Sequence, residues 1–181
     1  MNKILALVFF LITITSFDSK SDQVIARQGQ VSFFSYTSVE NIEAKNNQVL
    51  SILDLSKNEI AISMLMRAFV FEKSLMHEHF NESYIESDIY PKATFEGAIV
   101  NFDPLAEKQV RIIKGILSIH GIDKEIEIKT TIENTNESYI LEGDFTVEVK
   151  DFDIKIPPLL ASNIAKTISI KFRFEYQPYE Q

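Results

Sequence analysis

The sequence predicts an all-β domain, an eight-stranded antiparallel β-barrel with a short helix between the third and fourth strands. The first observation is a repeated pattern in which segments of roughly 8 to 14 residues alternate apolar and polar side chains, as half-buried strands do. The second is the length of 181 residues, typical of one domain with its own core. The third is the composition, 45% hydrophobic and 24% charged, which is that of a globular protein. A closed barrel is preferred over an open sandwich because it leaves no sheet edges.

The N-terminus has the features of an export signal, which we assign to residues 1–19. Lys3 supplies the positive charge, and the apolar run Ile4 to Ile14 is shorter than the ~20 residues that a membrane span requires. Cleavage is expected between Ser16 and Ser21. With no cysteine in the chain, disulfides, thiolate metal sites and N-terminal lipid attachment through cysteine are excluded.

The first three strands are expected after a polar stretch that runs from Phe17 to about Gln30. They cover Gly29–Val39, Gln48–Leu55 and Asn58–Phe71, with the turn "LSKN" between the second and third. In the third strand one face carries Ile60, Ile62, Met64, Met66, Ala68 and Val70, and the other carries Leu65, Phe69 and Phe71. Because the outer face is also apolar near the strand's end, another element should cover it.

The remaining five strands are expected at Lys92–Asn101, Gln109–His120, Lys124–Glu133, Tyr139–Val149 and Thr167–Tyr176. The tight connection "HGID" joins the fifth strand to the sixth. Before the eighth strand, Pro157 and Pro158 interrupt pairing, and Leu159–Ala165 is expected to form a helical turn.

Charge and motifs exclude several function classes. The formal net charge of -8 argues against a nucleic-acid partner, since phosphate binding requires clustered Lys and Arg. The chain has no Gly-rich phosphate loop, dinucleotide-binding turn or Gly-x-Ser-x-Gly elbow. We therefore expect no cofactor and no catalytic residue set, and the sequence leaves both a monomer and a homodimer open.

The segment "SLMHEHF" brings two histidines and a glutamate together. Ser74 is expected as N-cap of a helix over Leu75–Ile85, on which His77 and His79 point roughly 200° apart and cannot bind one metal ion. In an extended segment they would share a face and form half a metal site, with His120 as the remaining histidine. We expect His79 to be partly buried against a backbone group and His77 and Glu78 to be solvated. A metal-assisted enzyme stays open as an alternative.

The order of residues across this region is more informative. The run "LMHEHFNESYIESDIYPKATFEG", followed by "GILSIHGIDKEIEI", resembles the YceI-like family of bacterial periplasmic and secreted proteins. The matching positions are Leu75, Met76, His79, Phe80, Tyr84, Tyr90, Pro91, Phe95, Gly97, Gly115, Leu117, His120 and Gly121. The resemblance covers the domain 29–177. It implies a lipocalin-like barrel whose apolar lumen binds an isoprenoid or fatty chain, with a helix that covers the third strand or closes one end.

These expectations together predict an exported carrier that sequesters a long-chain amphiphile in its lumen. The candidate ligand-binding residues are the inward alternates of four strands: Ile60, Ile62, Met64, Met66, Ile126, Ile128, Phe145, Val147, Ile168, Ile170, Phe172 and Phe174. The same list fits a core filled by side chains, and a filled barrel that binds a protein partner is a further alternative.

Overall fold

The structure of the chain is a computed structural model, and it describes residues 22–37, 41–135, 138–156 and 165–179. The expected signal peptide at residues 1–19 lies outside these ranges. So does the expected helical turn, except for Ala165, which belongs to no helix.

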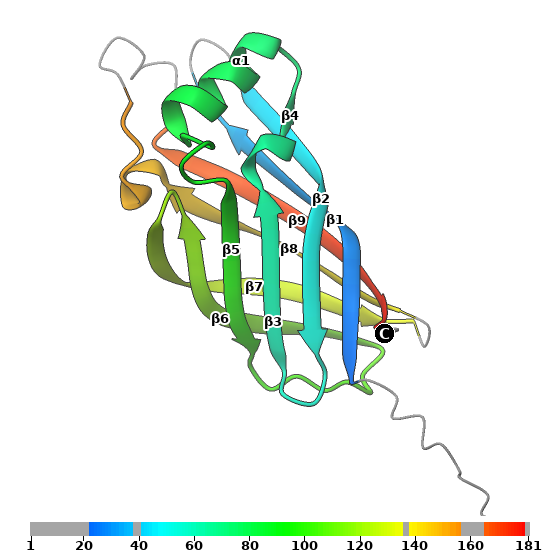
Figure 1. The fold of residues 1–181 in the computed structure, drawn as a ribbon. Helices are drawn as coiled ribbons and strands as arrows, with labels where there is room; N and C mark the ends of the chain where they lie inside the picture. Colours follow the sequence, from blue (N-terminus) through cyan, green and yellow to red (C-terminus); the bar gives the residue numbers. More distant parts are fainter. Residues whose placement is uncertain (1–21, 38–40, 136–137, 157–164, 180–181) are drawn as a thin grey trace, which may run out of the picture.

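Eight long antiparallel strands close into a barrel, as the sequence predicts (Figure 1). Neighbours along the sheet follow the order β1-β9-β8-β7-β6-β5-β3-β2, and the pairing of β1 with β2 closes it. A short ninth strand, β4, pairs only with β2. The strands are β1 (Gln23–Ser35), β2 (Ile42–Asp54), β3 (Glu59–Leu65), β4 (Val70–Phe71), β5 (Lys92–Ile99), β6 (Lys108–Ile119), β7 (Ile122–Asn134), β8 (Tyr139–Glu148) and β9 (Thr167–Pro178).

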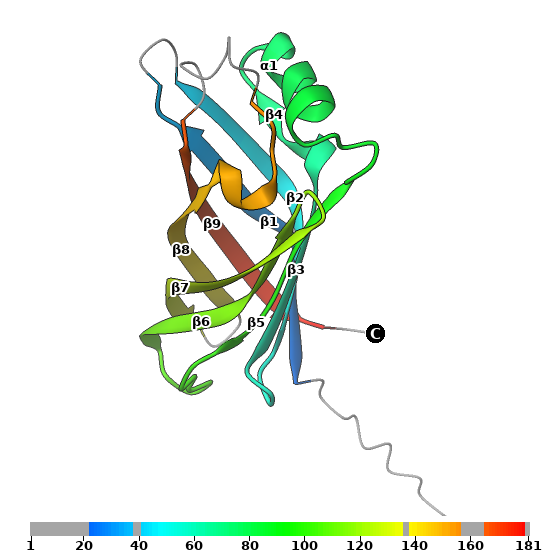
Figure 2. The same cartoon turned by 90° about the vertical axis from the view of Figure 1, so that its left-hand side faces the viewer.

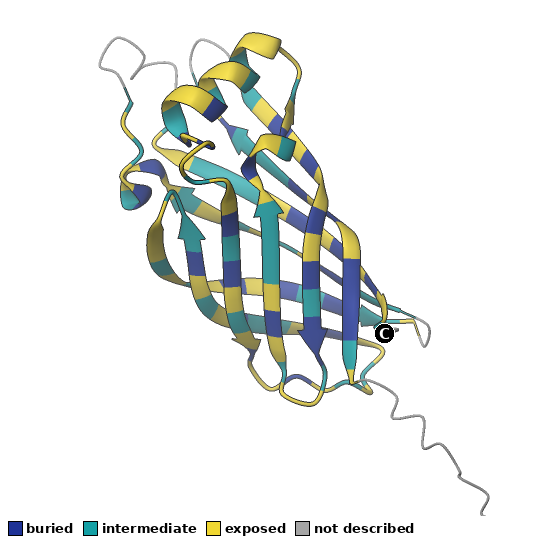
Figure 3. Cartoon of the chain, in the orientation of Figure 1, coloured by how far each residue is buried: buried dark blue, intermediate teal, exposed yellow. Residues whose placement is uncertain are grey.

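Alternation of side chains along the strands produces the inside and the outside of the barrel (Figure 3). The longest regular pairing joins β6 to β7, from Lys108 opposite Glu133 to Ile119 opposite Ile122. Its two-residue connection is His120-Gly121, with φ of 53° and 74°. Two successive positive φ angles are what a type I′ hairpin turn requires, which explains the glycine here.

The barrel has two different ends, which we call the base and the mouth. The base contains the turn 55–58 and the loop 100–107, and the mouth contains α1 (Ser74–His79) and the 3₁₀ turn η3 (Val149–Phe152) (Figures 1 and 2). The helix therefore closes one end of the barrel, the second of the two placements expected for it.

The third strand is shorter than expected, and this corrects the assignment of its faces. It ends at Leu65, and the 3₁₀ turn η1 (Met66–Ala68) follows before β4. This turn shifts the alternation, so that Val70, expected inside, is 69% exposed. Phe69, expected outside, is buried at 3% exposure.

Strand β1 also differs from its expected bounds. It begins at Gln23, within the stretch expected to be an unpaired polar segment, and ends at Ser35. The reason is that residues Gln23–Ala26 pair with residues Ser51–Asp54 at the end of β2, although polar residues stand on both sides of them in the sequence.

The helical segment departs from a simple α-helix. Ser74 is the first helical residue and Lys73 precedes it without a side-chain cap, so the expected Ser74 N-cap is wrong. After His79 the chain forms a π-helical turn, η2 (Phe80–Tyr84), closed by the Ile85 N–H donating to the Phe80 carbonyl at 2.9 Å. No helix in the described ranges has the length and apolar character needed to cross a membrane.

Packed side chains fill the base. Leu53, Ile132 and Tyr176 have no exposed surface. The Tyr176 hydroxyl lies 2.6 Å from Ser51 Oγ, and burial raises the pKa of Tyr176, so the phenol stays protonated there. The lumen is therefore blocked at this end.

Candidate functional site

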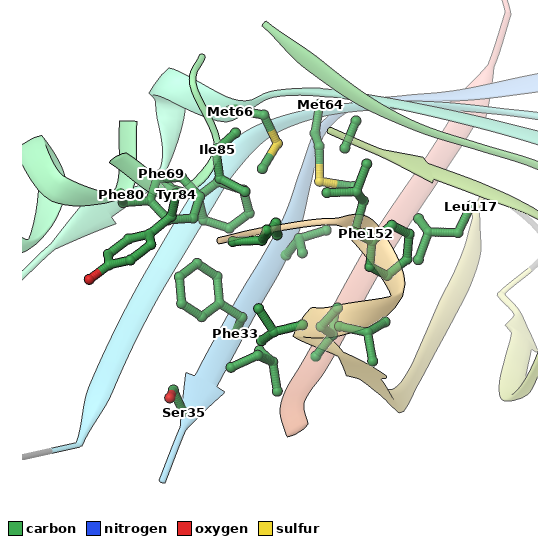
Figure 4. Close-up of a pocket in the computed structure, with 18 of the residues that line it drawn as sticks. Phe33, Ser35, Met64, Met66, Phe69, Phe80, Tyr84, Ile85, Leu117 and Phe152 are labelled. Carbon is green, nitrogen blue, oxygen red and sulfur yellow. The ribbon is translucent and has the colours of Figure 1, made fainter. Parts of the chain in front are cut away.

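A cavity of about 440 Å³ occupies the barrel from the mouth toward its middle (Figure 4). Its wall comes from the barrel strands, from α1 and η2, and from the turn that contains η3. Leu75 and His79 line it and are also exposed to solvent, so the cavity reaches the surface beside α1.

Four phenylalanines form an aromatic cluster at the mouth. Phe33 comes from β1, Phe69 and Phe71 follow η1, and Phe80 begins η2. The ring centroids of Phe33 lie 5.3 Å from Phe69 and 5.5 Å from Phe80, and Phe71 and Phe80 are 5.0 Å apart. These are favourable distances for aromatic pairs, so the rings hold α1 and η2 against the barrel.

The structure places ten of the twelve candidate ligand-binding residues on the cavity wall. They are Ile62, Met64, Met66, Ile128, Phe145, Val147, Ile168, Ile170, Phe172 and Phe174. The other two are part of the packed core rather than of this wall: Ile60 is buried and Ile126 packs partly buried against the core. Contact of any of these residues with a ligand remains a prediction.

Polar side chains on the described wall belong to mouth elements. Ser35 ends β1, His79 ends α1 and Tyr84 ends η2. Ser35 is buried and its Oγ accepts a hydrogen bond from the Ala165 N–H at 3.1 Å. Burial raises the pKa of the Tyr84 hydroxyl, which therefore stays uncharged.

The two histidines of the helix have exchanged the roles expected for them. His77 is the half-buried one, with Nδ1 3.0 Å from the Phe69 carbonyl and its ring edge-on to Phe71. His79, expected to be partly buried, is exposed. The cause is the unexpected inward turn of Phe69 and Phe71, which brings a backbone carbonyl under His77.

His120 lies in a different set of contacts at the mouth. Its Nδ1 is 3.0 Å from the Phe152 carbonyl, its Nε2 is 3.0 Å from Glu86 Oε2, and its ring packs on Tyr90. These contacts join the β6–β7 hairpin to η3 and to the segment after η2. Within the described ranges, no three His, Cys, Asp or Glu side chains are grouped so that they could hold a metal ion.

The aromatic cluster is a part of the cavity wall that was not expected from the sequence. Alternation in β1 offered a signal for Phe33, which shares its face with Val31 and Ser35, and all three line the cavity. Phe69 and Phe71 had no such signal, because the turn that redirects them has an ordinary strand-like sequence.

Comparison with known proteins decides the family. A family model described as the YceI-like domain matches residues 12–176. The chain belongs to the YceI-like family. A comparison with curated protein sequences gave no match.

Solved structures share the YceI-like fold at low sequence identity. A polyisoprenoid-binding domain from Saccharophagus degradans, implicated in plant cell wall breakdown, superposes with a TM-score of 0.75 at 11% identity, covering 88% of this chain and 100% of that one. BcnA from Burkholderia cenocepacia gives 0.69 at 17% identity, covering 81% and 95%. The YceI protein of Campylobacter jejuni gives 0.64 at 14% identity, covering 80% and 90%.

Proposed function

We propose that this YceI-like protein binds a long-chain isoprenoid, or another long-chain amphiphilic lipid, in the barrel cavity. The observation that carries the proposal is the apolar cavity of about 440 Å³ that reaches the surface at the mouth. Its size lies within the roughly 300–1,000 Å³ typical of small-molecule sites. The Saccharophagus degradans structure, a polyisoprenoid-binding domain of the same fold, supports the choice of ligand class.

The wall suits a flexible hydrocarbon chain. Each buried methylene contributes about 0.8 kcal/mol, so a long chain is held without any ionic anchor. Met64 and Met66 point their thioether sulfurs into the cavity (Figure 4). Flexible methionine side chains adapt to ligands of different shape. We propose the ten candidate residues on the wall, together with the aromatic cluster, as the ligand contacts.

Binding is favoured over catalysis because the site offers apolar surface rather than reactive groups. Of the three histidines, His77 and His120 are engaged with backbone carbonyls, and only His79 lines the cavity. A barrel filled by side chains, acting only through a protein partner, is disfavoured by the cavity itself.

The proposed carrier acts after export. Residues 1–19 carry the Lys3 charge and the short apolar run of a signal peptide, so we place the mature protein in the periplasm or outside the cell. The intact mass of protein recovered from those fractions should show cleavage between Ser16 and Ser21. A full-length mass would contradict this assignment.

Mass spectrometry of an organic-solvent extract tests the binding function. The mature protein is purified from its native compartment without detergent, and a stoichiometric prenyl or acyl species is expected. The matched control is Ala93→Phe, which places a ring in the cavity from a wall position and should leave the extract empty. An empty extract from the unaltered protein, even after incubation with a long-chain prenol, would overturn the proposal.

A further inference from the structure

Among the described residues that line the cavity, the ionisable side chains are those of His79 and Tyr84, and none is Lys, Arg, Asp or Glu. An anionic group taken into this wall would lose its hydration and find no lysine or arginine among these residues to replace it, which is strongly unfavourable.

Hydrogen-bonding groups that are uncharged lie where a head group would rest. Ser35 Oγ uses one acceptor site for the Ala165 N–H, and no group among the described residues accepts its own proton. Figure 4 shows the Tyr84 hydroxyl directed away from the apolar centre of the cavity. An amphiphile would therefore place its tail among the wall residues and its polar end at the mouth.

The helical segment beside the mouth carries an excess of negative charge. Residues 72–88 run over this end of the barrel and contain five exposed carboxylates against one lysine. The carboxylates are those of Glu72, Glu78, Glu82, Glu86 and Asp88; Asp88 pairs with Arg67, and Glu86 Oε2 lies 3.0 Å from His120 Nε2. An anionic head group that stayed outside the cavity would meet this acidic segment instead of water alone.

We propose that the cavity selects amphiphiles with an uncharged head group and discriminates against the same chain carrying an anionic one. The inference rests on the proposed lipid-binding function and narrows its ligand class. It follows from the wall, whose described residues offer no lysine or arginine, and the acidic segment 72–88 beside the mouth adds to the discrimination.

A pair of ligands with one chain and two head groups tests this selection. Geranylgeraniol and geranylgeranyl phosphate compete below their aggregation concentrations with a bound fluorescent apolar probe. The alcohol should displace the probe at a concentration at least about 100-fold lower than the phosphate requires. The reason is that an unpaired charge at a desolvated site weakens binding by at least about this factor. Equal displacement would overturn the head-group selection and leave lipid binding intact. Displacement by neither would overturn both proposals.

A charge placed at the mouth sharpens the test. Leu75 lines the cavity and is 59% exposed, so Leu75→Arg adds a cation at the mouth without disturbing the core. It should shift the ratio of phosphate binding to alcohol binding at least about tenfold toward the phosphate. Leu105→Arg, on the 87% exposed Leu105 of the base loop, is the matched control and should change neither. If Leu75→Arg leaves the preference unaltered, charge at the mouth does not govern ligand choice.

Discussion

At the base, the lumen is filled by side chains such as Leu53, Ile132 and Tyr176, none of which has exposed surface. At the mouth, the same eight strands enclose a cavity of about 440 Å³. The loop 100–107 is fastened to the base by hydrogen bonds, including those from Tyr139 and Asn134 to the Pro104 carbonyl. The mouth is held by aromatic contacts of α1 and η2 together with the contacts of His77 and His120 to backbone carbonyls.

The difference shows that alternation of apolar residues builds both a packed core and a hollow site. On the cavity wall, Phe174 stacks on Phe172 and lies against Gly29, where an added Cβ would stand 2.3 Å from the Phe174 ring. The absence of a side chain at Gly29 thus permits dense packing behind this part of the wall.

Truncation of an apolar side chain should give the largest difference in stability between a substitution at the base and one at the mouth. Leu53→Ala at the base should lower the free energy of unfolding by about 2–5 kcal/mol, because it opens a void in a close-packed region. Met64→Ala, on the cavity wall, should cost about 1 kcal/mol, since it enlarges a space that already exists. Urea denaturation of both variants measures the difference, and equal losses would show that the mouth is packed as tightly as the base.

Enlargement of a small side chain should produce the next largest effect on stability. The variant that loses less stability should be the one that loses ligand binding. Ala26 is buried in the core, so Ala26→Phe should destabilise by about 1–3 kcal/mol. Ala93 is buried in the same core but also lines the cavity, so Ala93→Phe should destabilise less than Ala26→Phe and abolish binding of a prenol. Thermal melting and probe displacement measured together check this, and a strongly destabilised Ala93→Phe would contradict an empty cavity.

The sequence was sufficient for the barrel but not for its hollow part. Period-2 alternation placed residues such as Ile128 and Phe172 inside, where the structure has them. It could not show whether these residues meet one another or surround a space, because that depends on the packing of all strands at once. The turn η1 likewise carries no sequence signal, and its effect on Phe69 and His77 could be found only in three dimensions.

Removal of one tyrosine hydroxyl at each end of the barrel should change the stability less than these substitutions of apolar side chains. Tyr176→Phe deletes the buried hydrogen bond with Ser51, which should cost about 1 kcal/mol. Tyr84→Phe at the mouth should not change stability, because the structure gives this hydroxyl no hydrogen-bond partner among the described residues. Denaturant midpoints report both, and a loss of stability in Tyr84→Phe would indicate a partner at the mouth.

Substitution of the two helix histidines should give the smallest change in stability. It tests whether His77, rather than His79, helps to hold the mouth together. His77→Ala removes the hydrogen bond to the Phe69 carbonyl and the contact with Phe71, and should lower stability by about 0.5 kcal/mol because the site is half-buried. His79→Ala should leave the stability unchanged, since its side chain is exposed.

Metal analysis of the purified protein and its His79→Ala variant completes this comparison. A metal-assisted enzyme would contain stoichiometric metal and lose it in His79→Ala without a change in melting temperature. The contacts of His77 and His120 with backbone carbonyls favour the opposite result, in which His77 supports the mouth and neither protein retains metal.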